Sequence, residues 1–170
     1  EQNADGDRDG LRYALTMRGE IAARAGERDA ERYFRNALAL APEDVRTLAA
    51  YARFLRGAGR GRDVDALLRG HPGHEGLRLQ RALALRETAP AEAGVIAANL
   101  ERSYATARRL GRVPELRDEA ELLLTFRRDP QGALAFAQDQ PPGQLRAESV
   151  AAACGGWATA NPQGAAAWAR

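Results

Sequence analysis

The first residues of the chain have the types and spacing that could hold a calcium ion. The run Asp5-Gly6-Asp7-Arg8-Asp9-Gly10 places a carboxylate at every second position and then a glycine, as the first half of a calcium-binding loop does. Such a loop needs a bidentate acid at its twelfth position, which is Thr16 here. We therefore expect no calcium site, and a flexible acidic tail over residues 1–10 that precedes a helix.

A second candidate metal site is formed by His71, His74 and the adjacent Glu75. Two imidazoles and a carboxylate are suitable zinc ligands. The two histidines flank Pro72-Gly73, which predicts a turn, and the neighbouring sequence supplies no further ligand. We expect a polar turn with His74 close to the start of a helix, and no metal.

Nucleophilic catalysis and phosphate binding are both poorly supported by the sequence. Cys154 would need a base beside it, and both histidines lie far away along the chain. The glycines Gly57, Gly59 and Gly61 lack the lysine of a phosphate-binding loop and follow a predicted helix. We predict a buried Cys154, no cofactor and no enzymatic activity.

The composition favours an all-α protein. Alanine and leucine dominate the apolar residues and β-branched residues are few, which favours helices over strands. The chain has 25 basic residues against 23 acidic ones, a net charge of +2. The two signs are interleaved, as on solvated helix faces, so we expect no nucleic-acid partner. No apolar run approaches the roughly 20 residues of a membrane span, and we expect none.

Apolar residues recur at an offset of 34 along the N-terminal part of the chain. The matched pairs are Ala14 with Leu48, Met17 with Tyr51, Ile21 with Leu55, Ala30 with Val64, and Phe34 with Leu68. The spacing within each copy fits one face of a helix, so Met17 and Ile21 are expected to face the core of the first helix pair.

The segment 29–42, DAERYFRNALALAP, carries a family resemblance. Ala30, Phe34, Ala37 and Pro42 have the spacing of the second helix of a tetratricopeptide repeat, and that family's period is also 34 residues. The next stretch resembles the family's first helix, its interhelix turn and the start of a second helix. Its matching residues are Leu48, Tyr51, Ala52, Leu55, Gly59, Val64 and Leu68.

Two departures from the repeat pattern are visible. Arg18 stands where the family has a small residue, and Pro72 comes four residues early, which shortens the last helix of the second repeat. Beyond it, proline and glycine predict helices over 75–87, 91–110 and 115–127, and further short helices follow.

The resemblance implies a right-handed α-solenoid of antiparallel helix pairs, a tetratricopeptide-like superhelix. Residues 11–170 are then one helical domain, and the whole resembles the C-terminal part of larger bacterial repeat proteins. Its expected parts are repeat 1 (11–43), repeat 2 (44–72), a divergent helix pair (73–111), a degenerate repeat (114–142) and a terminal helix pair (144–170).

The family binds proteins or peptides in a concave groove lined by the first helix of each pair. Its groove-facing residues are the second, fifth, ninth and twelfth of each repeat. In repeat 1 these positions hold Arg12, Leu15, Gly19 and Ala22. In repeat 2 they hold Arg46, Ala49, Arg53 and Arg56.

The four groove arginines, Arg12, Arg46, Arg53 and Arg56, are therefore the candidate site, and the cluster on repeat 2 suits an acidic partner. The alternative is that these arginines are simply solvated on a charged helix face. Leu15, Gly19 and Ala49 replace the Lys and Asn of the family's chaperone-tail clamp, so that particular activity is not expected.

Two other functions stay open beside a protein-binding scaffold. The first is a structural segment that self-assembles, because Trp157 and Trp168 near the C-terminus form either part of the core or a self-association surface. The second is a small-ligand-binding helical domain with a pocket beside residues 91–110. The sequence does not identify the partner or the compartment.

Overall fold

A computed structural model describes residues 2–112 and 116–127 of the chain. Every element in these residues is helical, which confirms the all-α prediction. The elements are α1 (Gln2–Ala25), α2 (Ala30–Leu40), α3 (Val45–Gly57), α4 (Gly61–Leu68), α5 (Glu75–Leu85), α6 (Pro90–Arg109), α7 (Leu116–Leu122) and the π-helix η1 (Leu123–Arg127). The predicted helices after residue 127 lie outside the described residues, as do Cys154, Trp157 and Trp168.

The predicted helix ends agree closely with the observed ones. The helices expected over 75–87, 91–110 and 115–127 are found as α5, α6, and α7 with η1. Gly59 and Gly111 end their helices in the left-handed region, with φ of 71° at both, where a residue with a Cβ is strained. The N-terminus differs from the expectation of a flexible tail over residues 1–10, because α1 is helical from Gln2.

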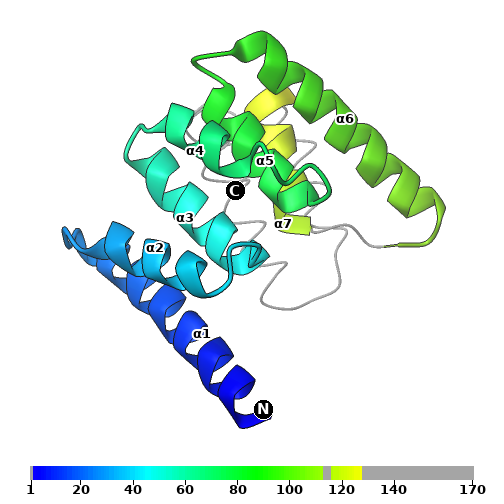
Figure 1. The fold of residues 1–170 in the computed structure, drawn as a ribbon. Helices are drawn as coiled ribbons and strands as arrows, with labels where there is room; N and C mark the ends of the chain where they lie inside the picture. Colours follow the sequence, from blue (N-terminus) through cyan, green and yellow to red (C-terminus); the bar gives the residue numbers. More distant parts are fainter. Residues whose placement is uncertain (1, 113–115, 128–170) are drawn as a thin grey trace, which may run out of the picture. The chain divides into compact units, whose positions relative to one another are not determined.

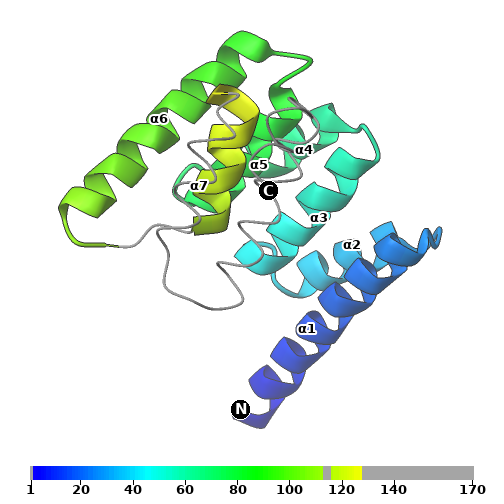
Figure 2. The same ribbon diagram turned by 180° about the vertical axis from the view of Figure 1, so that it is seen from behind.

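The chain divides into two compact units, Glu1–Ala93 and Gly94–Arg170. In the first unit, α2 runs back along the C-terminal half of α1, and the N-terminal half of α1 extends beyond it (Figures 1 and 2). The core of this unit is built from apolar residues of α2, α3, α4 and α5. Its fully buried large members include Phe34, Leu48, Leu55, Val64 and Leu77.

Aromatic rings join α2 to α3 in this core. The ring centroid of Phe34 lies 5.6 Å from that of Tyr51 and 5.7 Å from that of Phe54. Aromatic pairs at such distances stabilise a core beyond their buried area. The α2 helix is thereby fixed on α3, and α1 packs closely on α2 at Gly19, where a Cβ would lie 2.8 Å from the Phe34 ring.

A close backbone approach sets the position of α4 on α5. A Cβ at Gly61, the first residue of α4, would lie 2.7 Å from the carbonyl oxygen of Ala84. Asp65 of α4 is buried and forms ion pairs with Arg69 and with Arg81 of α5, the latter at 2.6 Å. A glycine and a paired buried carboxylate therefore hold these two helices together.

The second unit begins within α6 and continues through α7 and η1. Leu100, Tyr104 and Leu122 are buried in it. Arg108 of α6 pairs with buried Glu119 of α7 at 2.5 Å. Burial raises the pKa of Glu119 and outweighs the opposing effect of Arg108.

Candidate functional site

The four candidate arginines lie where α1 and α3 run side by side. Arg12 is on α1, and Arg46, Arg53 and Arg56 are on α3. Contacts between the two helices advance together along both sequences, from Thr16 with Thr47 to Glu20 with Arg53, so the helices are parallel. We call the surface formed by Tyr13, Met17 and Glu20 of α1 with Arg46, Arg53 and Arg56 of α3 the α1–α3 face.

Arg46 is held against α1 by a ring and a thioether. Its guanidinium carbon lies 4.9 Å from the centroid of the Tyr13 ring, and one terminal nitrogen lies 3.4 Å from the sulfur of Met17. A ring under the guanidinium plane gives a cation–π contact and does not occupy the donors at the guanidinium edge, one of which contacts the Met17 sulfur. Within the described part of the chain, Arg46 forms no ion pair.

Arg53 lies two helical turns further along α3 and has an acidic partner. One of its terminal nitrogens lies 3.2 Å from a carboxylate oxygen of Glu20 on α1. Solvent reaches 41% of the Arg53 side chain and 25% of the Glu20 side chain. Arg56 follows one turn later on α3 and is half-buried. The three arginines thus project from one side of α3.

Arg12 belongs to a separate, more buried network. Its guanidinium pairs with Asp44 at 2.7 Å, and Asp44 accepts hydrogen bonds from the amide and the hydroxyl of Thr47 at the start of α3. The Thr47 hydroxyl lies 2.7 Å from that of Thr16. Burial alone would raise the pKa of Asp44, but Thr47 and Arg12 together lower it. This network fastens α1 to the N-terminus of α3.

The predicted register of the first helix is wrong by one residue. Ala14 is exposed and Ile21 is 48% exposed, whereas Gly19 and Ala22, expected in the groove, are buried. Gly19, not the exposed Arg18, is the small residue beneath Phe34.

The cause of the shift is the length of the first helix connection. One residue fewer separates Gly19 from Phe34 than separates the buried Ala52 from Leu68. A one-residue change turns a helix by about 100°. The α1 residues that meet the arginines of α3 are consequently Tyr13 and Glu20, each one position later than expected.

Tyr13 and Glu20 were missed by the sequence reasoning, although a signal for them exists. They are seven residues apart on α1, as Arg46 and Arg53 are on α3. Two parallel helices in contact bring such pairs together, one across from the other. A search for complementary pairs with the same seven-residue spacing would have found both.

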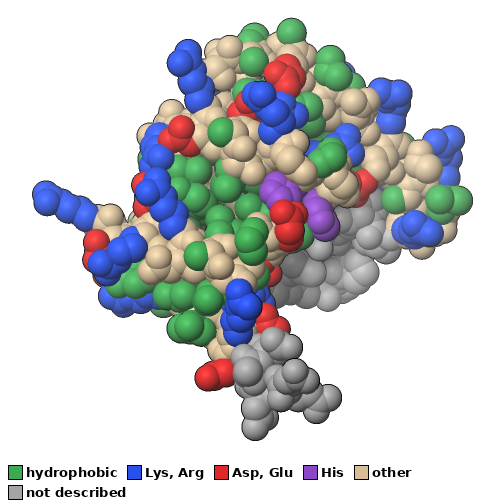
Figure 3. All heavy atoms as spheres, in the orientation of Figure 1, with side chains coloured by type: hydrophobic (Ala, Val, Ile, Leu, Met, Phe, Trp, Pro, Cys, Tyr) green, Lys and Arg blue, Asp and Glu red, His purple; other side chains and the backbone are tan. Residues whose placement is uncertain are grey.

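The histidine cluster forms a polar turn. His74 directly precedes α5, and Nδ1 of His71 lies 3.0 Å from a carboxylate oxygen of Glu43 in the loop between α2 and α3. In the view of Figure 3, histidine side chains lie beside acidic ones, and acidic and basic side chains are interleaved elsewhere on the visible surface. In the residues that the structure describes, no three His, Cys, Asp or Glu side chains gather as a metal site would require. The backbone of residues 5–10 is helical and has no calcium-loop form.

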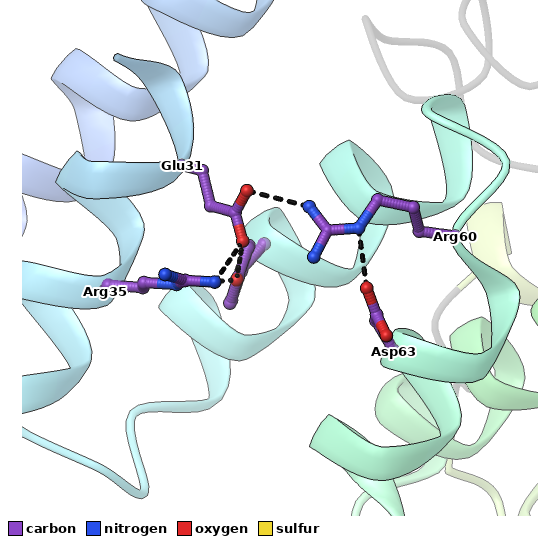
Figure 4. Close-up of polar contacts among 5 residues, drawn as sticks. Glu31, Arg35, Arg60 and Asp63 are labelled. Atoms are coloured by element: carbon purple, nitrogen blue, oxygen red, sulfur yellow. Dashed lines mark hydrogen bonds and ion pairs between the residues drawn. The ribbon is translucent and has the colours of Figure 1, made fainter. Parts of the chain in front are cut away.

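A second charged cluster connects α2, α3 and α4 and is structural in character (Figure 4). Glu31 of α2 accepts hydrogen bonds from Arg60 at 2.7 Å, from the Tyr51 hydroxyl at 2.6 Å and from Arg35 at 2.7 Å. Arg60 also pairs with Asp63 at 2.6 Å. Hydrogen bonds from Arg60 and Tyr51 lower the pKa of Glu31 from 4.5 to about 2. This carboxylate therefore stays ionised and ties the two helix pairs together.

Comparisons with family models, with curated proteins and with solved structures find no match to this chain. Among the described residues, no helix has both the length and the apolar character needed to cross a membrane.

Proposed function

We propose that this chain is a tetratricopeptide-like solenoid segment that binds an acidic stretch of a partner protein on the α1–α3 face. Parallel packing of α1 and α3, each followed by a returning helix, supports the repeat interpretation. The first helices of successive pairs then line one surface, and that surface carries Arg46, Arg53 and Arg56. No catalytic residue or cofactor is part of the proposal.

The main support for the proposal is that the Arg46 guanidinium is held by neutral groups, the Tyr13 ring and the Met17 sulfur. Tyr13 and Met17 hold the guanidinium in place. The Arg46 side chain therefore loses less conformational entropy when a ligand binds than an unrestrained arginine would. Its edge donors are not taken by an ion pair in the described part of the chain. A planar guanidinium in this state suits a bidentate carboxylate.

The test is a titration with an acidic peptide. We expect Arg46→Gln to weaken binding of a glutamate-bearing peptide by about 1.5–3 kcal/mol, the usual contribution of a hydrogen bond to a charged group. Arg62→Gln is the matched control, because Arg62 is exposed on α4, away from the α1–α3 face. Equal binding by both variants would refute the proposal.

Self-association is the second candidate function, and exposed apolar side chains on α1 favour it. Leu11 and Ile21 are each about half exposed, and Ala14 between them is also exposed. Apolar residues on one side of a helix commonly mark a contact surface. Sedimentation across a range of protein concentrations separates the two candidates, since a self-associating chain grows in mass with concentration.

A further inference from the structure

The Glu20–Arg53 contact has the same chemistry as the ligand contact proposed for this surface. Glu20 extends from α1 across to α3 and places a carboxylate oxygen 3.2 Å from the Arg53 guanidinium. An acidic ligand on the α1–α3 face would offer its own carboxylate to that guanidinium. The two carboxylates would compete, because bringing both to one exposed arginine places like charges side by side.

Arg46 and Arg53 therefore differ as anchors. Arg46 is held by a ring and a sulfur, which a carboxylate does not have to displace. Arg53 is held by a carboxylate, which a ligand does have to displace. The two arginines are seven residues apart on α3, a rise of about 10 Å. A ligand with two acidic groups about 10 Å apart would meet one open anchor and one occupied anchor.

We infer that Glu20 is a specificity-determining residue of the α1–α3 face, an internal competitor that lowers affinity for a second ligand carboxylate at Arg53. The inference rests on the proposed function. Glu20 acts by repelling or competing with acidic groups at that one position, so ligands are selected mainly by the carboxylate that reaches Arg46. Selection by an unfavourable contact is a general route to specificity.

The chain contains a matched ion pair that serves as the control. Glu27 lies 3.4 Å from Arg18, again between side chains that are partly exposed. Arg18 and Glu27 are not part of the α1–α3 face. Glu20→Gln and Glu27→Gln each remove one negative charge and one surface ion pair. A general gain in attraction for an acidic peptide would therefore be the same in both variants.

Two helical probe peptides distinguish the anchors. Both are alanine-rich peptides of about 16 residues. The first carries glutamate at two positions seven residues apart, which places the carboxylates about 10 Å apart on one side of a helix. The second carries glutamine at one of these positions. Affinities are measured by fluorescence anisotropy at low ionic strength, where surface charges are weakly screened.

We expect Glu20→Gln to bind the two-glutamate peptide about two- to fivefold more tightly than the wild type does, the factor set by the usual strength of an exposed ion pair. The one-glutamate peptide should gain less than this, and Glu27→Gln should match the wild type with both peptides. Arg53→Gln should abolish the advantage of the second glutamate in the Glu20→Gln background.

An equal or lower affinity of Glu20→Gln, with binding that still depends on Arg46, would overturn the inference while the proposed function survived. Binding that depends on neither Arg46 nor Arg53 would overturn both. Urea unfolding of Glu20→Gln and Glu27→Gln shows whether each variant is folded, so a lost signal is assigned to the surface and not to unfolding.

Discussion

Glu31→Gln tests whether the charged cluster between α2, α3 and α4 stabilises the first unit. Glutamine keeps the shape of the side chain but removes the charge and one of the two acceptor oxygens, of which one accepts from Arg60 and the other from Tyr51 and Arg35. The fall of the Glu31 pKa from 4.5 to about 2 corresponds to roughly 3 kcal/mol of folding free energy, at about 1.4 kcal/mol per pH unit. Solvent reaches 23% of this side chain and screens the charges, so we expect a loss of about 1–2 kcal/mol at pH 7.

The pH dependence of that loss has a definite sign. The carboxylate has a lower pKa when folded than when unfolded, so its stabilising effect is complete above pH 4.5. It is lost as the pH falls from 4.5 towards 2, and more than half of it is gone at pH 3. The difference between the wild type and Glu31→Gln should shrink accordingly.

The assay is urea unfolding followed by circular dichroism at pH 7 and pH 3, with hydrogen exchange of the α2 and α3 amides as a local readout. Asp29→Asn is the control, because Asp29 and Arg32 form an exposed ion pair at 3.0 Å that should contribute less than about 0.5 kcal/mol. Equal stability of Glu31→Gln and the wild type at pH 7, or an undiminished difference at pH 3, would refute the reasoning.

Two further predictions concern the fold. Gly61→Ala should destabilise the first unit by about 1–3 kcal/mol, because the new Cβ would lie 2.7 Å from the Ala84 carbonyl oxygen. Gly57 is the last residue of α3, and a Cβ there would meet no atom within 4 Å, so Gly57→Ala should stabilise the unit by up to about 1 kcal/mol. Thermal unfolding of both variants checks this, and a loss at both sites would contradict it. Asp44→Ala should cost about 1–2 kcal/mol, since it removes the cap on the Thr47 amide at 2.9 Å. An unchanged urea midpoint would show that this cap is dispensable.

Much of the fold was predictable because nearby proline and glycine residues determine where the helices end. Proline and glycine at Pro42, Gly59, Pro72 and Gly111 limit the helices whatever the tertiary packing is, and all four lie between helices. The buried face of α3 was also predictable, since Leu48, Tyr51 and Leu55 have helical spacing and all are buried.

The face of α1 was not predictable in the same way. Its apolar residues are spread around the helix, so spacing alone does not choose between a face through Met17 and Ile21 and one through Gly19 and Ala22. The choice is made by the tertiary contact of Gly19 with Phe34, which depends on the length of the helix connection. Glycine has no side chain that marks a packing position, so periodicity overlooks it.

Only some of the residues of the α1–α3 face were named from the sequence. Arg46, Arg53 and Arg56 were named from the repeat spacing, and all three lie on α3. Their partners on α1 were not, because they depend on the shifted register. The role of Arg12 also depends on a contact with Asp44 that is distant in sequence, and such ion pairs carry no periodic signal.

The most direct test of partner binding on the α1–α3 face is an affinity capture from the source cell with mass-spectrometric identification. Three forms of the chain are compared: the wild type, Arg46→Glu with Arg53→Glu, and Arg32→Glu with Arg62→Glu as a control with the same change of charge on exposed side chains outside that face. All three are first checked for helicity by circular dichroism. We predict a protein captured by the wild type and the control and lost by the Arg46 and Arg53 variant. A protein captured equally by all three would contradict the account.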